Sequence, residues 1–473
     1  MRDNKTFFNK IRRTLFILLA CLLFSTQLQA APIRFIVAGD SRGGYFGPPV
    51  NEEILAEIAA ATVAEGADFI LVPGDLVWGY GGSGPLETQL SQWISIMQPV
   101  YDAGIGVYPC RGNHETPQDD FAGTAWNAAF TGPYALPTNG PAGEVGITYS
   151  FSQENVFVVA LDQYFEGEET QKINQAWLDE QFEANTLPHI FVFGHEPAFR
   201  VADRDCLDLK PAERNNFWES IAAAGGRTYF HTHDHMYAHA RIDDGDDNPY
   251  NDVHQFVVAT LTDSFYGPPT YTGNNAPYTP VDIFHQIETF GYVVVDVDGP
   301  DVTITWKART APGVYEAGGD VFNYSKGSIQ VDKCKVKAGK KGKGDSLQFS
   351  GTLDAGAANF DEAMDDDIIV AIDAKGIPDP DVTTFIFPID EDSFKKGKYK
   401  SPKIKPANKN DPVTSLQIDS IKGKIKFSGK NLDLSGLGCP ITITIQIANY
   451  SAEIVLDEEI VNGPKKPCPP ELM

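Results

Sequence analysis

Basic residues are scarce in this 473-residue chain, in which 38 Lys and Arg stand against 64 Asp and Glu and give a formal net charge of −26. The imbalance is concentrated in residues 31–320, which hold 12 basic and 41 acidic side chains. Proteins that bind nucleic acid present a positive face to the phosphate backbone. We therefore expect no nucleic-acid-binding surface and interpret the acidity as an aid to extracellular solubility.

Long apolar runs are also lacking, apart from "TLFILLACLLF" at Thr14–Phe24. Basic residues precede this run and "TQLQA" follows it, a pattern typical of a secretory signal peptide over residues 1–30. A lipoprotein cut at Cys21 and twin-arginine export are the alternatives. The run is too short for a transmembrane helix and no later segment is long enough, so the mature chain is predicted to be secreted or periplasmic.

Cysteine is rare, with six residues in the chain and no Cys-x-x-Cys pair, so a zinc ribbon is not expected. Cys110 ends an apolar strand pattern and is predicted to be a buried free thiol. Export permits disulfides, and Cys334 is a plausible partner of Cys439 or Cys468.

From about residue 325 onward the sequence contains no His, Arg or Trp, so a catalytic role is not expected there. Strand-like runs separated by Gly, Lys, Asp and Pro predict an all-β sandwich over residues 328–473. A weak internal repeat relates "SLQFSGTLD" at Ser346–Asp354 to "KFSGKNLDL" at Lys426–Leu434. This domain is expected to follow a linker at 319–327 and to serve as an attachment or spacing module for a surface or another protein.

Residues 31–318 alternate between apolar strand-like runs and amphipathic helical runs, with two hairpins, at 148–162 and 291–308. This alternation predicts an α/β sandwich. Its strands end in residues that ligate metals, several of them directly after a glycine, and these residues are Asp40, Asp75, Asn113, His114, His195, His233 and His235. Ligands of open α/β sheets bind outside the carboxyl ends of the strands, so we expect these side chains to meet.

The order "GD … GD … GNHE … GHEP … HDH" resembles that of the calcineurin-like metallophosphoesterases, which include the purple acid phosphatases. The resemblance covers residues 33 to about 310. It implies a four-layer sandwich of two mixed sheets flanked by helices, holding two ions of Fe, Mn or Zn.

The family pattern, carried over position by position, implies a role for each of these residues. Asp75 would bridge the metals and His114 would donate a proton to the leaving group. The remaining ligands would be Asp40 and His235 on the first metal and Asn113, His195 and His233 on the second. The implied reaction is attack of a metal-bound hydroxide on a phosphate mono- or diester, carried by a small molecule or a biopolymer.

The sequence departs from this pattern at three positions. Arg42 stands where the family usually has a histidine on the first metal, and Trp78 stands where purple acid phosphatases have a tyrosine. Ser41, Tyr45, Tyr80 or water are candidate replacements for the missing ligand. Thr232 occupies a position that is normally glycine. Arg42 thus favours a second hypothesis, a non-catalytic surface or matrix protein with a degenerate domain.

Two arginines and the histidine cluster have further possible roles. Arg42 or Arg111 could stabilise charge at the phosphate, or each could form a structural ion pair. Strand parity alone does not distinguish His231, His233 and His235. The resemblance selects His233 and His235, places His231 behind the ligands and His239 at the rim, and leaves His231 with His233 as the alternative pair. Aromatic loops at Val77–Pro85 and Ser264–Pro280 could stack an organic leaving group.

Overall fold

The computed structural model describes residues 30–44, 47–165, 172–202, 206–246, 248–262, 264–337, 344–354, 367–374, 383–389, 398–401, 411–434 and 441–456. The predicted signal peptide, Tyr45, Cys439 and Cys468 lie outside these residues, so the leader stays a prediction. Cys334 is a buried free thiol, which contradicts the disulfide predicted for it. Cys110 is buried and unpaired, as expected, and burial raises the pKa of its thiol well above the usual value. Among the described residues, no helix combines the length and apolar character needed to cross a membrane.

The first sheet of the N-terminal region has the order β13-β12-β11-β1-β2-β3, with β1, β2 and β3 parallel to one another. Helices on its outer face supply buried apolar side chains such as Ile54 and Trp93 to the same core as the strands. The strands are β1 (Ile33–Val37), β2 (Phe69–Pro73), β3 (Gly106–Cys110), β11 (Gly291–Asp298), β12 (Asp301–Ala311) and β13 (Val314–Lys337), and the helices are α2 (Glu52–Ala64), α3 (Leu86–Asp102) and α4 (Thr124–Ala129).

The second sheet has the order β10-β8-β9-β7-β6-β5-β4 and is covered by two helices. Its strands are β4 (Tyr149–Gln153), β5 (Val156–Ala160), β6 (His189–Phe193), β7 (Thr228–His231), β8 (Tyr237–Asp243), β9 (Val253–Val258) and β10 (Thr279–Gln286), and the helices are α5 (Gln175–Ala184) and α6 (Pro211–Ala223). Short 3₁₀ turns occur at Gly81–Ser83, Thr116–Gln118, Gly132–Tyr134 and Leu207–Leu209.

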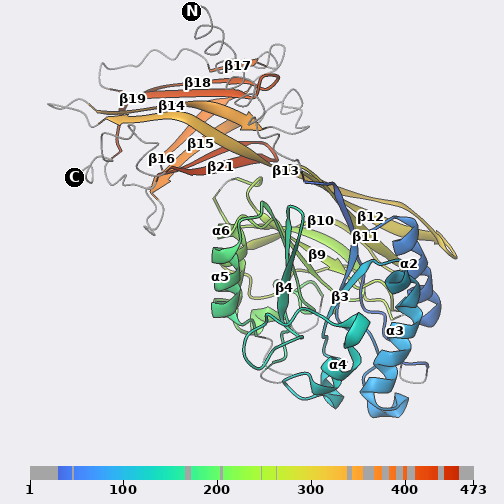
Figure 1. The fold of residues 1–473 in the computed structure, drawn as a ribbon. Coiled ribbons are helices and arrows are strands. Elements are labelled where there is room, and N and C mark those ends of the chain that lie inside the picture. The colour runs from blue at the N-terminus through green and yellow to red at the C-terminus, as the bar shows by residue number, and fades with distance from the viewer. Residues whose placement is uncertain are drawn as a thin grey trace, which may run out of the picture.

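The two sheets pack face to face, with α2, α3 and α4 on one flank and α5 and α6 on the other (Figure 1). Phe35 of β1 meets Phe191 of β6 across the interface, at a ring-centroid distance of 4.9 Å. A separate apolar core that includes Trp177 and Phe217 lies between the second sheet and its helices. This arrangement is the predicted four-layer sandwich, and it aligns the carboxyl ends of β1, β2, β3, β6 and β7 along one edge.

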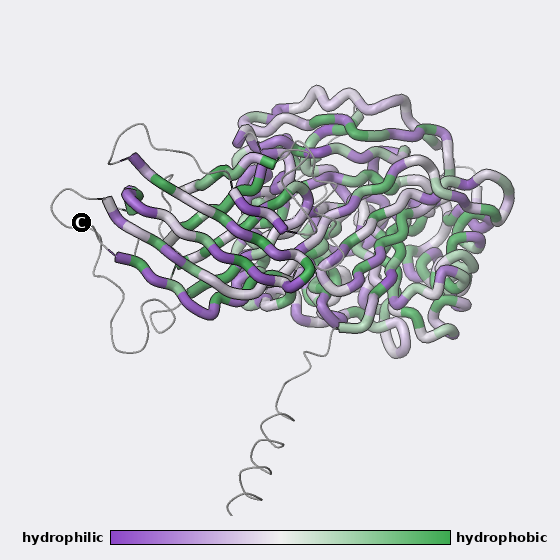
Figure 2. Tube along the Cα trace, turned by 90° about the horizontal axis from the view of Figure 1, so that it is seen from above, coloured by the Kyte–Doolittle hydropathy of each residue, from purple (hydrophilic) through white to green (hydrophobic). Residues whose placement is uncertain are grey.

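The C-terminal region consists of strands that enclose a second apolar core. Purple and green alternate along these strands in Figure 2, as expected where one face of each strand is buried. Phe427 contacts Phe385, which lies on a strand that does not pair with the strand of Phe427. The two rings therefore meet across the core, and this confirms the predicted sandwich. The strands are β14 (Asp345–Asp354), β15 (Asp367–Ala374), β16 (Thr383–Pro388), β17 (Lys398–Lys400), β18 (Val413–Asp419), β19 (Lys424–Leu432), β20 (Ile441–Ile447) and β21 (Tyr450–Leu456).

The two repeat segments form neighbouring antiparallel strands, β14 and β19. Phe349 lies directly opposite Phe427 in this pairing, and their rings stack at 5.2 Å. The repeat therefore corresponds to two strands that pair with each other within one sandwich.

Strand β13 joins the two regions without interruption (Figure 1). Its first half pairs with β12, and its second half pairs with β14 and β21. Residues 319–327, predicted as a linker, lie inside this strand. The connection is therefore a continuous strand, and Phe322 and Tyr324 from that segment are part of the N-terminal core.

Candidate metal centre

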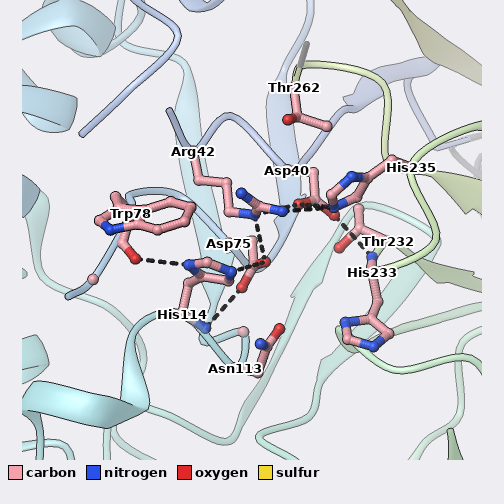
Figure 3. A network of polar contacts seen from close by, with 12 residues as sticks. Asp40, Arg42, Asp75, Trp78, Asn113, His114, Thr232, His233, His235 and Thr262 are labelled. Atoms are coloured by element: carbon pink, nitrogen blue, oxygen red, sulfur yellow. Dashed lines mark hydrogen bonds and ion pairs between the residues drawn. The ribbon is translucent and has the colours of Figure 1, made fainter. Parts of the chain in front are cut away.

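The predicted ligand positions lie at the edge where the strands end, and Figure 3 labels all of them except His195. Asp40 follows β1, Asp75 follows β2, and Asn113 and His114 follow β3, while the second sheet supplies His195 after β6 and His233 and His235 after β7. All of the carboxylates and histidines in this set are buried. One carboxylate oxygen or ring nitrogen from each of Asp40, Asp75 and His195 lies within 4.8 Å of the others.

Three of these residues have positive backbone φ angles: 61° at Asp40, 51° at Asp75 and 68° at His233. Non-glycine residues seldom adopt this conformation, and it persists where surrounding contacts over-determine it, often at functional sites. Here, hydrogen bonds between loops hold it. The Asp40 carboxylate accepts the His233 N–H at 2.8 Å, and the Asp75 carboxylate accepts the His114 N–H at 3.0 Å.

Four side chains form what we call the donor cluster: Asp75, Asn113, His195 and His233. His195 Nε2 lies 3.4 Å from Asp75 Oδ1, 3.0 Å from Asn113 Oδ1 and 3.1 Å from His233 Nδ1. Ligand atoms held about 2.1 Å from one ion are separated by about 3.0–3.4 Å, so the three distances from His195 Nε2 match those between ligands of one transition metal ion.

The protonation of His195 strengthens this assignment. Its Nδ1 lies 3.0 Å from the Pro73 carbonyl oxygen, which can only accept, so Nδ1 carries the hydrogen and donates it. In the neutral ring, Nε2 then presents a lone pair to the oxygens of Asp75 and Asn113. Such a convergence of acceptors is stabilised by a cation among them, and a neutral nitrogen beside carboxylate and amide oxygens suits Fe, Mn or Zn.

Thr232 holds His195 in this orientation. Its Oγ1 lies 2.8 Å from His195 Nδ1 and donates to the Pro73 carbonyl. The threonine at the usual glycine position is thus accommodated, and its methyl group fills the space beside Gly39, where an added Cβ would lie 2.6 Å from Thr232 Cγ2.

Arg42 lies among the three residues expected to hold the first metal (Figure 3). Its Nε is 3.3 Å from Asp75 Oδ2 and 3.7 Å from Asp40 Oδ1, and its Nη2 is 3.1 Å from His235 Nε2. Asp40, Asp75 and His235 therefore do not fit a metal ion while the guanidinium lies there.

Two buried glutamates, which the sequence motifs did not identify as site residues, organise the loops. Glu115 accepts hydrogen bonds from the backbone N–H groups of Gly112 (2.7 Å), Asp75 (3.1 Å) and Val77 (3.1 Å). Burial and the nearby Asp75 raise the pKa of Glu115 well above its usual value. Glu196 lies 3.6 Å from His233 Nε2 and accepts from the Tyr164 hydroxyl. Both directly follow a predicted site histidine, in "NHE" and "GHE", and that position was the available signal.

His114 lies beside the donor cluster, next to Asp75. Its Nδ1 donates to the Trp78 carbonyl oxygen at 2.7 Å, and its Nε2 lies 3.9 Å from Asp75 Oδ2. Burial lowers the pKa of His114, so the ring is neutral near pH 7. Rings from both predicted aromatic loops reach the site: Tyr80 contacts His114 at 5.3 Å and Tyr266 stacks on His235 at 4.2 Å.

Two residues predicted near the substrate or the rim lie elsewhere. Arg111 is 1% exposed and forms a bidentate ion pair with Asp162, at 3.1 and 2.7 Å, which favours the structural ion pair over substrate binding. His239 is buried in β8, between Asp320 and His254, and does not lie at the rim.

His231 is fully buried at the end of β7 and stacks on Tyr229. Burial lowers the pKa of its ring to about 3. It therefore packs behind the ligands as a neutral residue, and His233 is the member of this run that reaches His195.

Comparison with protein families assigns the N-terminal region. Residues 33–237 match the family model for calcineurin-like phosphoesterases, so this part of the chain is a domain of that family and the resemblance of its motifs is confirmed. A search of curated proteins finds no match to the chain.

Solved structures with a similar fold include a purple acid phosphatase from yellow lupin (Lupinus luteus), at 15% identity and a TM-score of 0.44 over 63% of this chain and 54% of the lupin chain. The present chain thus spans about half of the lupin phosphatase. GAP50, the anchor in the inner membrane complex of Plasmodium, matches at 12% identity and 0.42, over 62% and 88% of the two chains. PhoD matches at 11% and 0.43, over 63% and 69%.

Proposed function

We propose that this protein is a secreted, metal-dependent phosphoesterase that hydrolyses phosphate mono- or diesters. The observation that carries the proposal is the donor cluster, in which donor atoms of Asp75, Asn113 and His233 lie 3.0–3.4 Å from His195 Nε2, with His114 beside Asp75. The family match over residues 33–237 supports the same class of chemistry.

The residues around the cluster have distinct roles in this proposal. When bound, the metal supplies a Lewis acid for the phosphoryl oxygen and lowers the pKa of water. His114 lies beside the cluster with its Nδ1 fixed by Trp78, so its Nε2 is oriented to donate a proton to the leaving oxygen. The negative charge of a bound phosphate favours the protonated ring, offsetting the lowering of its pKa by burial. Tyr80, which is 43% exposed, offers a face for an organic leaving group.

The two-metal, hydroxide-attack mechanism expected from the family fits these residues only in part. The donor cluster fits one ion, whereas the residues for the other surround Arg42. Because Arg42 lies where a metal ion is expected, the second hypothesis, a non-catalytic surface or matrix protein, also has to be tested.

Hydrolysis of p-nitrophenyl phosphate and bis-p-nitrophenyl phosphate tests the function. Metal-free protein should gain activity on at least one substrate after addition of Mn²⁺, Zn²⁺ or Fe²⁺, and His114→Ala and Asn113→Ala should each lose most of it. Reconstituted protein that is inert on both substrates contradicts the phosphoesterase and favours the non-catalytic hypothesis. Full activity in both variants would refute the site assignment alone. N-terminal sequencing of the exported protein tests secretion, with Ala31 expected first.

A further inference from the structure

A single guanidinium group faces every donor atom that a first metal ion would need. Arg42 Nε approaches Asp75 Oδ2 at 3.3 Å and Asp40 Oδ1 at 3.7 Å, and Arg42 Nη2 approaches His235 Nε2 at 3.1 Å. These residues come from β1, β2 and β7, the strands whose ends would otherwise surround the ion.

The contact with His235 has a defined polarity. His235 Nδ1 donates to the Ser264 carbonyl oxygen, so Nε2 presents a lone pair. Arginine can only donate, and Arg42 therefore uses the lone pair that would bind a metal. His235 and Asp40 act here as positioning residues for a cation that the chain itself supplies.

Arg42 is held firmly in this place. Its side chain is 11% exposed, its guanidinium carbon lies 5.4 Å from the centre of the Trp78 ring, and its backbone N–H donates to the Asp75 carbonyl at 3.0 Å. A guanidinium remains protonated at every physiological pH, so a second divalent ion would have to displace a permanent positive charge from between two carboxylates.

We propose that this protein binds one metal ion, at Asp75, Asn113, His195 and His233, and that the Arg42 guanidinium takes the place of the second. The inference rests on the proposed function and refines it. Arg42 would present fixed positive charge to the phosphoryl group, while activation of water would depend on the single ion. The departure from the family motif is then a replacement of one cation by another, and the charge of the site is retained.

Metal counting tests the proposal directly. Full-length mature protein is stripped of metal, loaded with excess Mn²⁺ or Zn²⁺, desalted, and analysed by elemental analysis and native mass spectrometry. We expect one ion per chain in the wild type and two in Arg42→His, which restores the family's histidine. Arg42→Lys keeps a cation and should remain at one, as should the matched control Arg34→His, whose arginine lies half-exposed on β1.

Two variants of predicted ligands distinguish a one-metal protein from a two-metal protein without altering Arg42. His195→Ala should abolish metal binding, whereas His235→Ala should still bind one ion. A two-metal protein would instead fall from two ions to one in His235→Ala. Electron paramagnetic resonance of the Mn²⁺-loaded wild type should show an isolated ion without spin coupling.

The possible results are distinguishable. Two ions in the wild type, or a spin-coupled pair, would overturn the Arg42 proposal and leave the phosphoesterase intact. No bound metal in a folded wild type would overturn both. If Arg42→His fails to fold, the comparison of His235→Ala with His195→Ala still decides between one ion and two.

Discussion

Gly112 has no space for a side chain beside the donor cluster. An added Cβ would lie 2.2 Å from Asp75 Oδ1 and 2.9 Å from His195 Cε1, far inside van der Waals contact. The glycine of "RGNHE" thus lets the loop after β3 approach two ligands at once.

We predict that Gly112→Ala weakens metal binding by about 10–100-fold, because it displaces Asp75 and His195 without removing a ligand. Isothermal titration with Mn²⁺ or Zn²⁺ measures the change. Gly82→Ala is the matched control, since an added Cβ there meets nothing within 4 Å. Equal affinities in the two variants would show that the cluster tolerates the displacement.

His189 is a buried histidine far from the donor cluster. Its Nε2 donates to the Gly299 carbonyl at 2.8 Å. The pKa of the ring is lowered to about 4, mainly by burial, and the hydrogen bond to Gly299 opposes this shift only in part. In the unfolded chain the pKa returns to about 6.5. The unfolded state therefore binds more protons between pH 6.5 and 4, and stability is lost as pH falls through that window.

We predict that His189→Gln flattens this acid destabilisation, by about 2–3 kcal/mol between pH 7 and 4.5. Chemical denaturation of the wild type and the variant across this range measures the difference, because the other titrating groups are common to both. Parallel stability profiles would contradict the prediction.

The residue types at the site were predictable because metal ligands recur in a fixed order at strand ends. The position of Arg42 was not, since sequence shows only that a ligand is missing, whereas the contacts with Asp75 and His235 depend on side-chain conformation. Likewise, Arg111 could not be assigned to Asp162 from the motif, because the two lie 51 residues apart.

At the scale of elements, β13 belongs to both cores. Within the segment predicted as a linker, Phe322 is 9% exposed and stacks on His254 at 4.0 Å, whereas its neighbour Val321 is 52% exposed on the opposite face. The change in composition near residue 325 marked the boundary between the two regions. The alternation of buried and exposed residues at 319–327 is that of a strand, but this segment was predicted as a linker.

We predict that Phe322→Ala destabilises the N-terminal region by about 3–5 kcal/mol, the usual cost of removing a buried phenyl ring. Val321→Ala should change stability by no more than about 0.5 kcal/mol. Thermal unfolding followed by tryptophan fluorescence suits the comparison, because all six Trp residues precede residue 307. A linker would tolerate both changes equally, so similar melting temperatures would contradict a structural role for this segment.

At the scale of the whole molecule, the two regions differ in charge as well as in fold. Residues 31–320, the region that contains the site proposed to take an anionic substrate, hold 41 acidic and 12 basic residues. Locally, Arg42 and a bound metal attract phosphate, but over longer distances the negative surface repels it. At low salt the Debye length is about 30 Å, so the whole surface acts on an approaching substrate, whereas at 0.15 M it shrinks to about 8 Å.

We therefore predict that kcat/KM for p-nitrophenyl phosphate rises roughly twofold or more between 10 and 150 mM ionic strength, because screening removes the long-range repulsion. The effect should be smaller for the bis-p-nitrophenyl ester, which carries one negative charge where the monoester carries two. Initial rates at subsaturating substrate give the ratio, with metal content checked at each salt concentration. A fall in kcat/KM with salt would mean that the cations at the site dominate the field seen by the substrate.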